Sequence, residues 1–210
     1  MCKVIKLLGP PGTGKTTTLL NYVEEELEKN EIDKIGYFSF TRKAAHEARD
    51  RAVVKFELDA RDFKWFSTLH SCGYHSIDLD GKAVMEKSQY ISFADKIGLK
   101  AKLAVDKETG MTDNVYLTHH NLARARGISL QEHYKKYVDS SVVDWRFLQY
   151  FSEAYDQYKE VNGYIDYCDM CYEAVNNNLL PALDVVFIDE AQDLTPLQWS
   201  MVEHFASTAK

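Results

Sequence analysis

Eight residues near the start of the chain have the types and spacing of a phosphate-binding loop: Gly9, Pro10, Pro11, Gly12, Thr13, Gly14, Lys15 and Thr16. In a glycine-rich turn between a strand and a helix, backbone N–H groups converge on an anion, and the helix N-terminus adds partial positive charge. Gly12 and Gly14 allow a positive φ and a close approach of backbone to phosphate. We therefore expect Gly9–Thr17 to bind a nucleotide, with Lys15 on the β and γ phosphates and the Thr16 hydroxyl on Mg²⁺.

Two adjacent carboxylates far along the chain complement this loop. Asp189 and Glu190 follow the apolar run Val185–Ile188, which reads as a strand. In an enzyme with a phosphate-binding loop, an aspartate at such a strand end organises Mg²⁺. Successive side chains of a strand diverge, so Glu190 is predicted to face the γ-phosphate and to accept a proton from, or orient, an attacking water.

The elements that must position these groups alternate between strand and helix. Apolar runs predict buried strands at Val4–Leu8, Ile35–Phe40, Phe63–Phe66 and Leu183–Ile188. Helical spacing predicts helices after Thr17, over Arg42–Phe56 and after Thr195. This order is typical of an α/β fold with a parallel sheet, whose strand ends bind ligands at the carboxyl edge.

The middle of the chain has a different character. Apolar residues recur at helical spacing over Asp144–Asn162, with Gly163 as a stop, and shorter helices are predicted over 84–97, 130–138 and 166–176. We expect a discontinuous nucleotide-binding domain, residues 1–80 and 163–210, interrupted by a mostly helical insertion, residues 81–162.

Composition limits the class of protein. The net charge is −7, with 45% hydrophobic residues, which is ordinary for a globular protein and argues against wholesale coating of nucleic acid. No run approaches the roughly 18 apolar residues that a membrane helix needs, and the first residues do not resemble a signal peptide. We expect an intracellular, cytoplasmic protein without a membrane partner. Cys168-x-x-Cys171, with His70, Cys72 and His75 upstream, suggests zinc only weakly, and we favour reduced thiols.

Several short segments resemble the UvrD/Rep/PcrA-like branch of superfamily 1 DNA helicases. The segment Asp189–Gln198 closely resembles motif II, Phe38–Ala45 looks like motif Ia, and Thr68–Ser71 looks like the Thr-Phe-His-Ser element. Ile165–Met170 is similar to the Asp-Phe-x-Asp stretch that precedes motif II. With the phosphate-binding loop, five segments occur in the family's order.

The resemblance implies a RecA-like domain 1A with domain 1B inserted, and ATP hydrolysis with Mg²⁺ that drives 3′–5′ movement along DNA. It implies that Lys15 and Thr16 serve phosphate and Mg²⁺, that Asp189 holds Mg²⁺, that Glu190 is the catalytic base, and that Gln192 senses the γ-phosphate. It also implies residues that line a path for single-stranded DNA, or a single-strand/duplex junction: Phe40, Thr41, Arg42, Thr68, Leu69 and His70. A second RecA-like domain of the same protein would supply an arginine finger, so we expect the chain to be an N-terminal piece. Roles in DNA replication, in DNA repair and in recombination are equally open.

The sequence also departs from the family. Arg42 stands where the family usually has Asn, and Leu69 stands in place of Phe. Only eight residues precede the loop, which leaves no usual place for an adenine-recognising glutamine motif. A nucleotide kinase and a non-catalytic binding module remain alternatives. The basic residues of the insertion can contact DNA or simply be solvated: Arg124, Arg126, Lys135 and Lys136.

Overall fold

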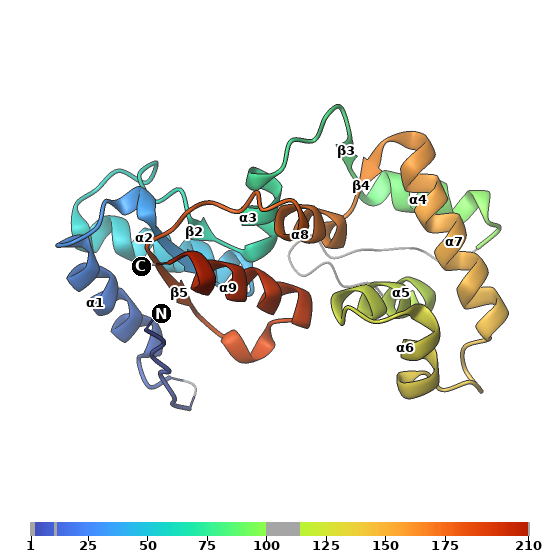
Figure 1. The fold of residues 1–210 in the computed structure, drawn as a ribbon, viewed down its shortest axis with the longest axis horizontal. Helices are drawn as coiled ribbons and strands as arrows, with labels where there is room; N and C mark the ends of the chain where they lie inside the picture. Colours follow the sequence, from blue (N-terminus) through green and yellow to red (C-terminus); the bar gives the residue numbers. More distant parts are fainter. Residues whose placement is uncertain (1–2, 11, 100–113, 210) are drawn as a thin grey trace. The chain divides into compact units, whose positions relative to one another are not determined.

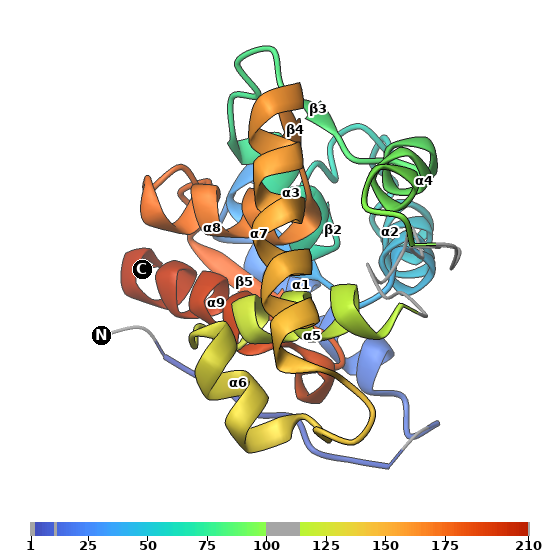
Figure 2. The same cartoon turned by 90° about the vertical axis from the view of Figure 1, so that its right-hand side faces the viewer.

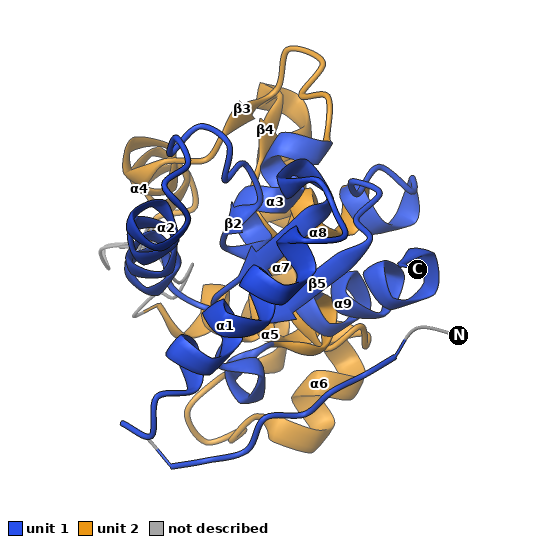
Figure 3. Cartoon of the chain, turned by 90° about the vertical axis from the view of Figure 1, so that its left-hand side faces the viewer, with its two compact units in different colours: residues 1–76, 174–194, 198–210 blue, residues 77–173, 195–197 orange. Residues whose placement is uncertain are grey.

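The computed structural model describes residues 3–10, 12–99 and 114–209 (Figure 1). Within it the chain forms two compact units (Figure 3). Unit 1 comprises residues 1–76, 174–194 and 198–210, and unit 2 comprises residues 77–173 and 195–197. Unit 1 carries the phosphate-binding loop and the Asp189–Glu190 pair, so it is the unit that positions the predicted nucleotide site.

Unit 1 is built on a three-stranded parallel sheet in the order β2-β1-β5. Its elements are α1 (Lys15–Leu27), η1 (Ile32–Lys34), β1 (Ile35–Phe38), α2 (Arg42–Phe56), β2 (Phe66–Ser67), α3 (Leu69–Ser76), β5 (Val185–Ile188), η2 (Ala191–Asp193) and most of α9 (Pro196–Thr208). The prediction of an α/β fold with a parallel sheet is confirmed.

Helices cover both faces of this sheet. Tyr37 and Phe66 on one face pack with Leu20 and Val23 of α1 and with Ala48 of α2. On the opposite face, the ring of Phe38 stacks on that of Phe205 in α9, with centroids 5.4 Å apart. Successive strand residues point to opposite faces of the sheet. Tyr37 therefore packs against the helices on one face of β1, and Phe38 packs against α9 on the other.

The first predicted strand is wrong. Residues 4–8 form no strand in the described part of the chain, and Val4 and Leu8 are 70% and 89% exposed. An apolar run becomes a strand only when a neighbouring strand supplies the hydrogen-bond ladder. Strand β5 pairs with β1 along its whole length, and no pairing with Val4–Leu8 is formed.

Unit 2 is mostly helical. It contains β3 (Ala83–Val84), α4 (Lys87–Lys96), α5 (Val115–Ala125), α6 (Leu130–Tyr137), α7 (Trp145–Asn162), β4 (Tyr164–Ile165) and most of α8 (Tyr167–Asn176). Phe93 of α4, Leu117 of α5, and Phe151 and Tyr155 of α7 share one apolar core. Figure 2 shows α7 as the long helix of this unit, with α5 in contact with it.

Side-chain caps and a glycine fix the ends of two helices in unit 2. Asp144 Oδ1 accepts a hydrogen bond from Phe147 N at 2.9 Å, and Gly163 closes α7 with a φ of 64°. Before α8, Asp166 Oδ1 accepts from Asp169 N and Asp169 Oδ2 accepts from Asp166 N, both at 2.9 Å. The helix predicted from residue 84 begins later, at Lys87, because Ala83–Val84 pair in parallel with Tyr164–Ile165 instead.

Candidate functional site

The glycine-rich loop has the backbone conformation that its sequence predicts. Gly12 and Gly14 both have a φ of 79°, and Gly14 is the N-cap of α1 without a side-chain cap. A Cβ on Gly9 would lie 2.7 Å from Thr13 Oγ1, so the loop also needs glycine at this point for close packing. The first N–H groups of α1 are thus left without a side-chain acceptor, which suits an anion. Pro11 lies outside the described residues.

Lys15 closes the loop on itself. Its Nζ donates to Gly9 O at 3.1 Å and to Pro10 O at 3.3 Å, and Thr13 Oγ1 donates to Pro10 O at 2.8 Å. These are bonds to neutral carbonyls within the loop. A phosphate would offer the ammonium a charged acceptor, which forms a stronger hydrogen bond than a neutral one.

Residues 173 positions apart meet at the start of α1. Thr16 Oγ1 donates to Asp189 Oδ2 at 2.9 Å. The same oxygen accepts from the Tyr37 hydroxyl at 2.9 Å, and Asp189 Oδ1 accepts from Glu190 N at 3.0 Å. A hydroxyl and a carboxylate are hard oxygen donors of the kind that Mg²⁺ takes, so this pair fits the ion that the loop implies.

Glu190 sits on a strained backbone directly after this carboxylate. Its φ of 55° and ψ of 42° are left-handed, a conformation that non-glycine residues rarely adopt. Its carboxylate accepts a hydrogen bond from Gln192 Nε2, and Gln192 itself is exposed. Strained residues cluster at functional sites, so the fold holds Glu190 and Gln192 together at a cost.

The six residues predicted to line a DNA path have different surroundings. Thr41 Oγ1 caps α2 by accepting from Ala44 N, and buried Thr68 Oγ1 accepts from Ser71 N, both at 3.2 Å. Leu69 is 1% exposed, so its side chain lies in the core. The side chain of Arg42 is exposed, and those of Phe40 and His70 are partly exposed, so a ligand could contact all three.

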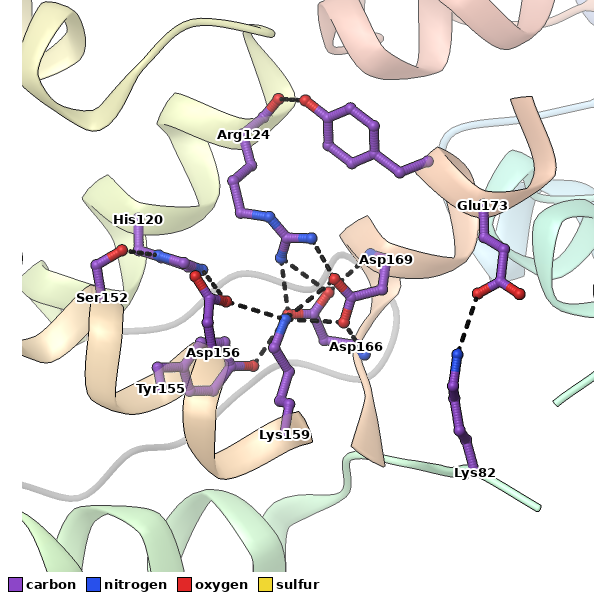
Figure 4. Close-up of polar contacts among 11 residues, drawn as sticks. Lys82, His120, Arg124, Ser152, Tyr155, Asp156, Lys159, Asp166, Asp169 and Glu173 are labelled. Carbon is purple, nitrogen blue, oxygen red and sulfur yellow. Dashed lines mark hydrogen bonds and ion pairs between the residues drawn. The ribbon is translucent and has the colours of Figure 1, made fainter. Parts of the chain in front are cut away.

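Unit 2 contains a second polar cluster, which Figure 4 shows. Buried Lys159 Nζ donates to Asp166 Oδ2 and Asp169 Oδ2, both at 2.8 Å. Arg124 donates to Asp166 Oδ2 at 3.0 Å and also pairs with Asp169, and Tyr155 OH donates to Asp166 Oδ2 at 3.1 Å. Burial raises the pKa of the Asp166 carboxyl, but Lys159 and Arg124 outweigh it and hold that pKa far below its ordinary value. Asp156 Oδ1 also lies 3.4 Å from Lys159 Nζ. Buried charges that are paired and hydrogen-bonded in this way are the pattern of a structural network.

The basic residues of unit 2 that were expected either to contact DNA or to be solvated have different surroundings. Arg124 forms ion pairs with Asp166 and Asp169. Arg126 donates a hydrogen bond to His133 Nδ1 at 3.0 Å, and its guanidinium lies over the Tyr137 ring. Lys136 pairs with Glu132 at 2.7 Å, and Lys135 is exposed. The charge of Arg124 is therefore offset by carboxylates of unit 2, whereas Arg126 contacts a histidine and a tyrosine ring.

Cys72, Cys168 and Cys171 belong to no cluster of metal-ligating side chains within the described residues. No group of three or more His, Cys, Asp or Glu side chains in the described residues could hold a metal ion. Cys72, Cys168 and Cys171 carry thiols, and Cys2 lies outside the described residues. Burial raises the pKa of Cys72 and of Cys168 to about 12, so neither forms the reactive thiolate at neutral pH. Within the same described residues no helix is both long and apolar enough to cross a membrane.

We expect unit 2 to lose stability in mild acid because of His120. This side chain is buried, its Nδ1 lies 2.7 Å from Ser152 Oγ, and burial lowers its pKa to about 4, although Asp156 opposes the shift. The unfolded chain binds the proton near the ordinary value of about 6.5, so stability is complete above that pH and falls toward pH 4. The loss amounts to about 3 kcal/mol at one pKa unit per 1.36 kcal/mol. Urea unfolding from pH 7 to pH 4 measures it, and a His120→Gln variant with the same pH profile as the wild type would contradict it.

Comparison with protein-family models matches the UvrD/REP helicase N-terminal domain over residues 1–210. Comparison with curated proteins gives no match. The family match spans the phosphate-binding loop, both strand-end carboxylates and unit 2.

Proposed function

The chain belongs to the UvrD/REP helicase N-terminal domain family, and from this premise we propose that it binds ATP with Mg²⁺ and single-stranded DNA and drives 3′–5′ translocation. Its helicase-type function follows from the family. The observation that supports the finer proposal is the 2.9 Å hydrogen bond from Thr16 Oγ1 to Asp189 Oδ2. It joins the loop suited to phosphate to the carboxylate suited to a metal ion.

Each residue of the proposed ATP site has a separate task. The N–H groups around Gly12 and Gly14 and the Lys15 ammonium hold the phosphates, which keeps the γ-phosphate at a fixed place. Thr16 and Asp189 hold Mg²⁺. The ion, when bound, neutralises charge that develops on the phosphates.

Glu190 and Gln192 would act on the water side of the reaction. The Glu190 carboxylate orients the attacking water and takes its proton, which is general-base catalysis. Gln192 already donates a hydrogen bond to that carboxylate, so it can respond when the γ-phosphate leaves. This contact is the proposed start of the coupling between hydrolysis and movement.

We propose that the DNA path is lined by the segments Phe40–Arg42 and Thr68–His70. Phe40 supplies a ring for base stacking, and Arg42 and His70 supply polar contacts to the strand. Thr41 caps the helix that begins at Arg42, and Thr68 caps the helix that carries His70. We also propose that a second RecA-like domain completes the ATP cleft and supplies an arginine finger.

Stimulation by DNA tests this function. Phosphate release by the natural full-length protein, measured with ATP and Mg²⁺, should rise at least about tenfold when single-stranded DNA is added. The residues 1–210 alone should release phosphate very slowly, because an arginine finger contributes about 10³–10⁵ in rate. A rate of ATP turnover that does not change when DNA is added would favour the nucleotide kinase. Absence of nucleotide binding would favour the non-catalytic binding module.

A further inference from the structure

A tyrosine from the middle of the sheet reaches the proposed metal carboxylate. Tyr37 lies in β1, is fully buried, and donates its hydroxyl proton to Asp189 Oδ2 at 2.9 Å. The strand register explains the contact. Tyr37 pairs with Phe187 in the parallel sheet, and Asp189 follows Phe187 by two residues on the same face. A phenol is long enough to span this diagonal.

The tyrosine ring is fixed from both sides. It stacks on Phe66 with centroids 5.2 Å apart and on Phe187 with centroids 6.4 Å apart. A phenol hydroxyl is a hydrogen-bond donor, and the Tyr37 hydroxyl donates to Asp189 Oδ2. The core therefore holds a neutral donor in one place against one oxygen of Asp189.

We infer that Tyr37 is a positioning residue that orients Asp189 toward the loop for Mg²⁺. Oδ2 is held by Tyr37 and Thr16, and Oδ1 is held by Glu190 N, so rotation of the carboxylate would break all three bonds. Groups that orient a metal ligand from behind raise metal affinity because the ligand needs no reordering when the ion binds. This inference rests on the proposed function, since it takes Asp189 as a Mg²⁺ ligand.

A purely structural role predicts a different outcome. A buried hydroxyl needs an acceptor, and Asp189 would then merely satisfy it. Removal of that hydroxyl would change the stability of the fold and leave the response to Mg²⁺ unchanged. The metal response therefore separates the two roles.

The test is the Tyr37→Phe variant, which keeps both ring stacks and removes only the hydroxyl. Binding of a fluorescent N-methylanthraniloyl ATP is titrated with Mg²⁺, first for the wild-type full-length protein and then for the variant. We expect the Mg²⁺ concentration at half effect to rise about tenfold, the lower end of the usual range for such residues. Nucleotide affinity in the presence of EDTA should stay within about twofold, as its phosphate contacts do not include Tyr37.

The matched control is Tyr155→Phe, which removes another buried hydroxyl donor to an aspartate, at 3.1 Å in unit 2. It should lower stability without moving the Mg²⁺ midpoint. An unchanged midpoint in Tyr37→Phe, while Asp189→Asn abolishes the Mg²⁺ effect, would overturn the positioning role alone. If the nucleotide affinity of the wild-type protein did not depend on Mg²⁺, the proposed function would be wrong, and the inference about Tyr37 with it.

Discussion

Replacement of Glu190 by Gln should reduce DNA-stimulated ATP turnover about 10²–10³-fold, within the range that general-base catalysis contributes. The amide keeps the size of the side chain and can accept the hydrogen bond from Gln192, but it cannot take a proton from water. The left-handed backbone at this residue, with a φ of 55°, costs Gln as much as it costs Glu. The backbone strain is therefore the same in the wild type and the variant, so the difference in turnover measures the loss of proton transfer to residue 190.

The measurement separates chemistry from binding. Phosphate release in a single turnover should fall, while the affinity for N-methylanthraniloyl ATP with Mg²⁺ should change by less than about threefold, because the removed interaction acts in the transition state. The matched control is Glu203→Gln in α9, which removes an equal charge from an exposed residue of unit 1. Turnover of Glu190→Gln at the wild-type rate would contradict the role of Glu190.

Local signals along the chain predict much of this structure. The helix over Arg42–Phe56 has its predicted bounds, and Asp144 and Asp166 cap the helices that follow them. Caps and helical spacing are properties of neighbouring residues, so a sequence displays them directly. The same holds for Gly12 and Gly14, whose positive φ follows from the motif.

Contacts between distant residues are less visible. The strand expected at Val4–Leu8 is not formed, although β5 is an edge strand of the sheet, because an apolar run does not by itself specify its pairing partner. Tyr37 looks like one more apolar position in β1, and only the register with β5 brings its hydroxyl to Asp189. The signal that could have identified this contact is a tyrosine in a strand adjacent to a strand that ends in a carboxylate residue.

The sequence predicts only part of the charge network in unit 2. Asp166 begins the helix predicted over residues 166–176, but the partners of Asp166 and Asp169, which are Lys159 and Arg124, lie on other helices. Arg124 in particular reads as surface charge until α5 is placed beside α7. The consequence is a large predicted effect on stability from a residue outside the proposed ATP site.

Replacement of Lys159 by Met should cost about 3–5 kcal/mol of unfolding free energy, the usual result of removing one partner of a buried ion pair. Methionine fills the space of the lysine stem, so the loss comes from charge. Lys159 is 5% exposed and Asp166 is 4% exposed. Without the ammonium, Arg124 alone faces two carboxylates that water reaches poorly.

Urea unfolding followed by circular dichroism measures this loss. Lys136→Met is the matched control, since it removes the same group from an exposed pair with Glu132, and it should change stability little. The double variant Lys159→Met/Asp166→Asn should lose less than the sum of its single variants, because it removes one negative charge that the first change leaves unpaired. Additive losses, or a Lys159→Met variant as stable as the wild type, would show that the network does not hold unit 2 together.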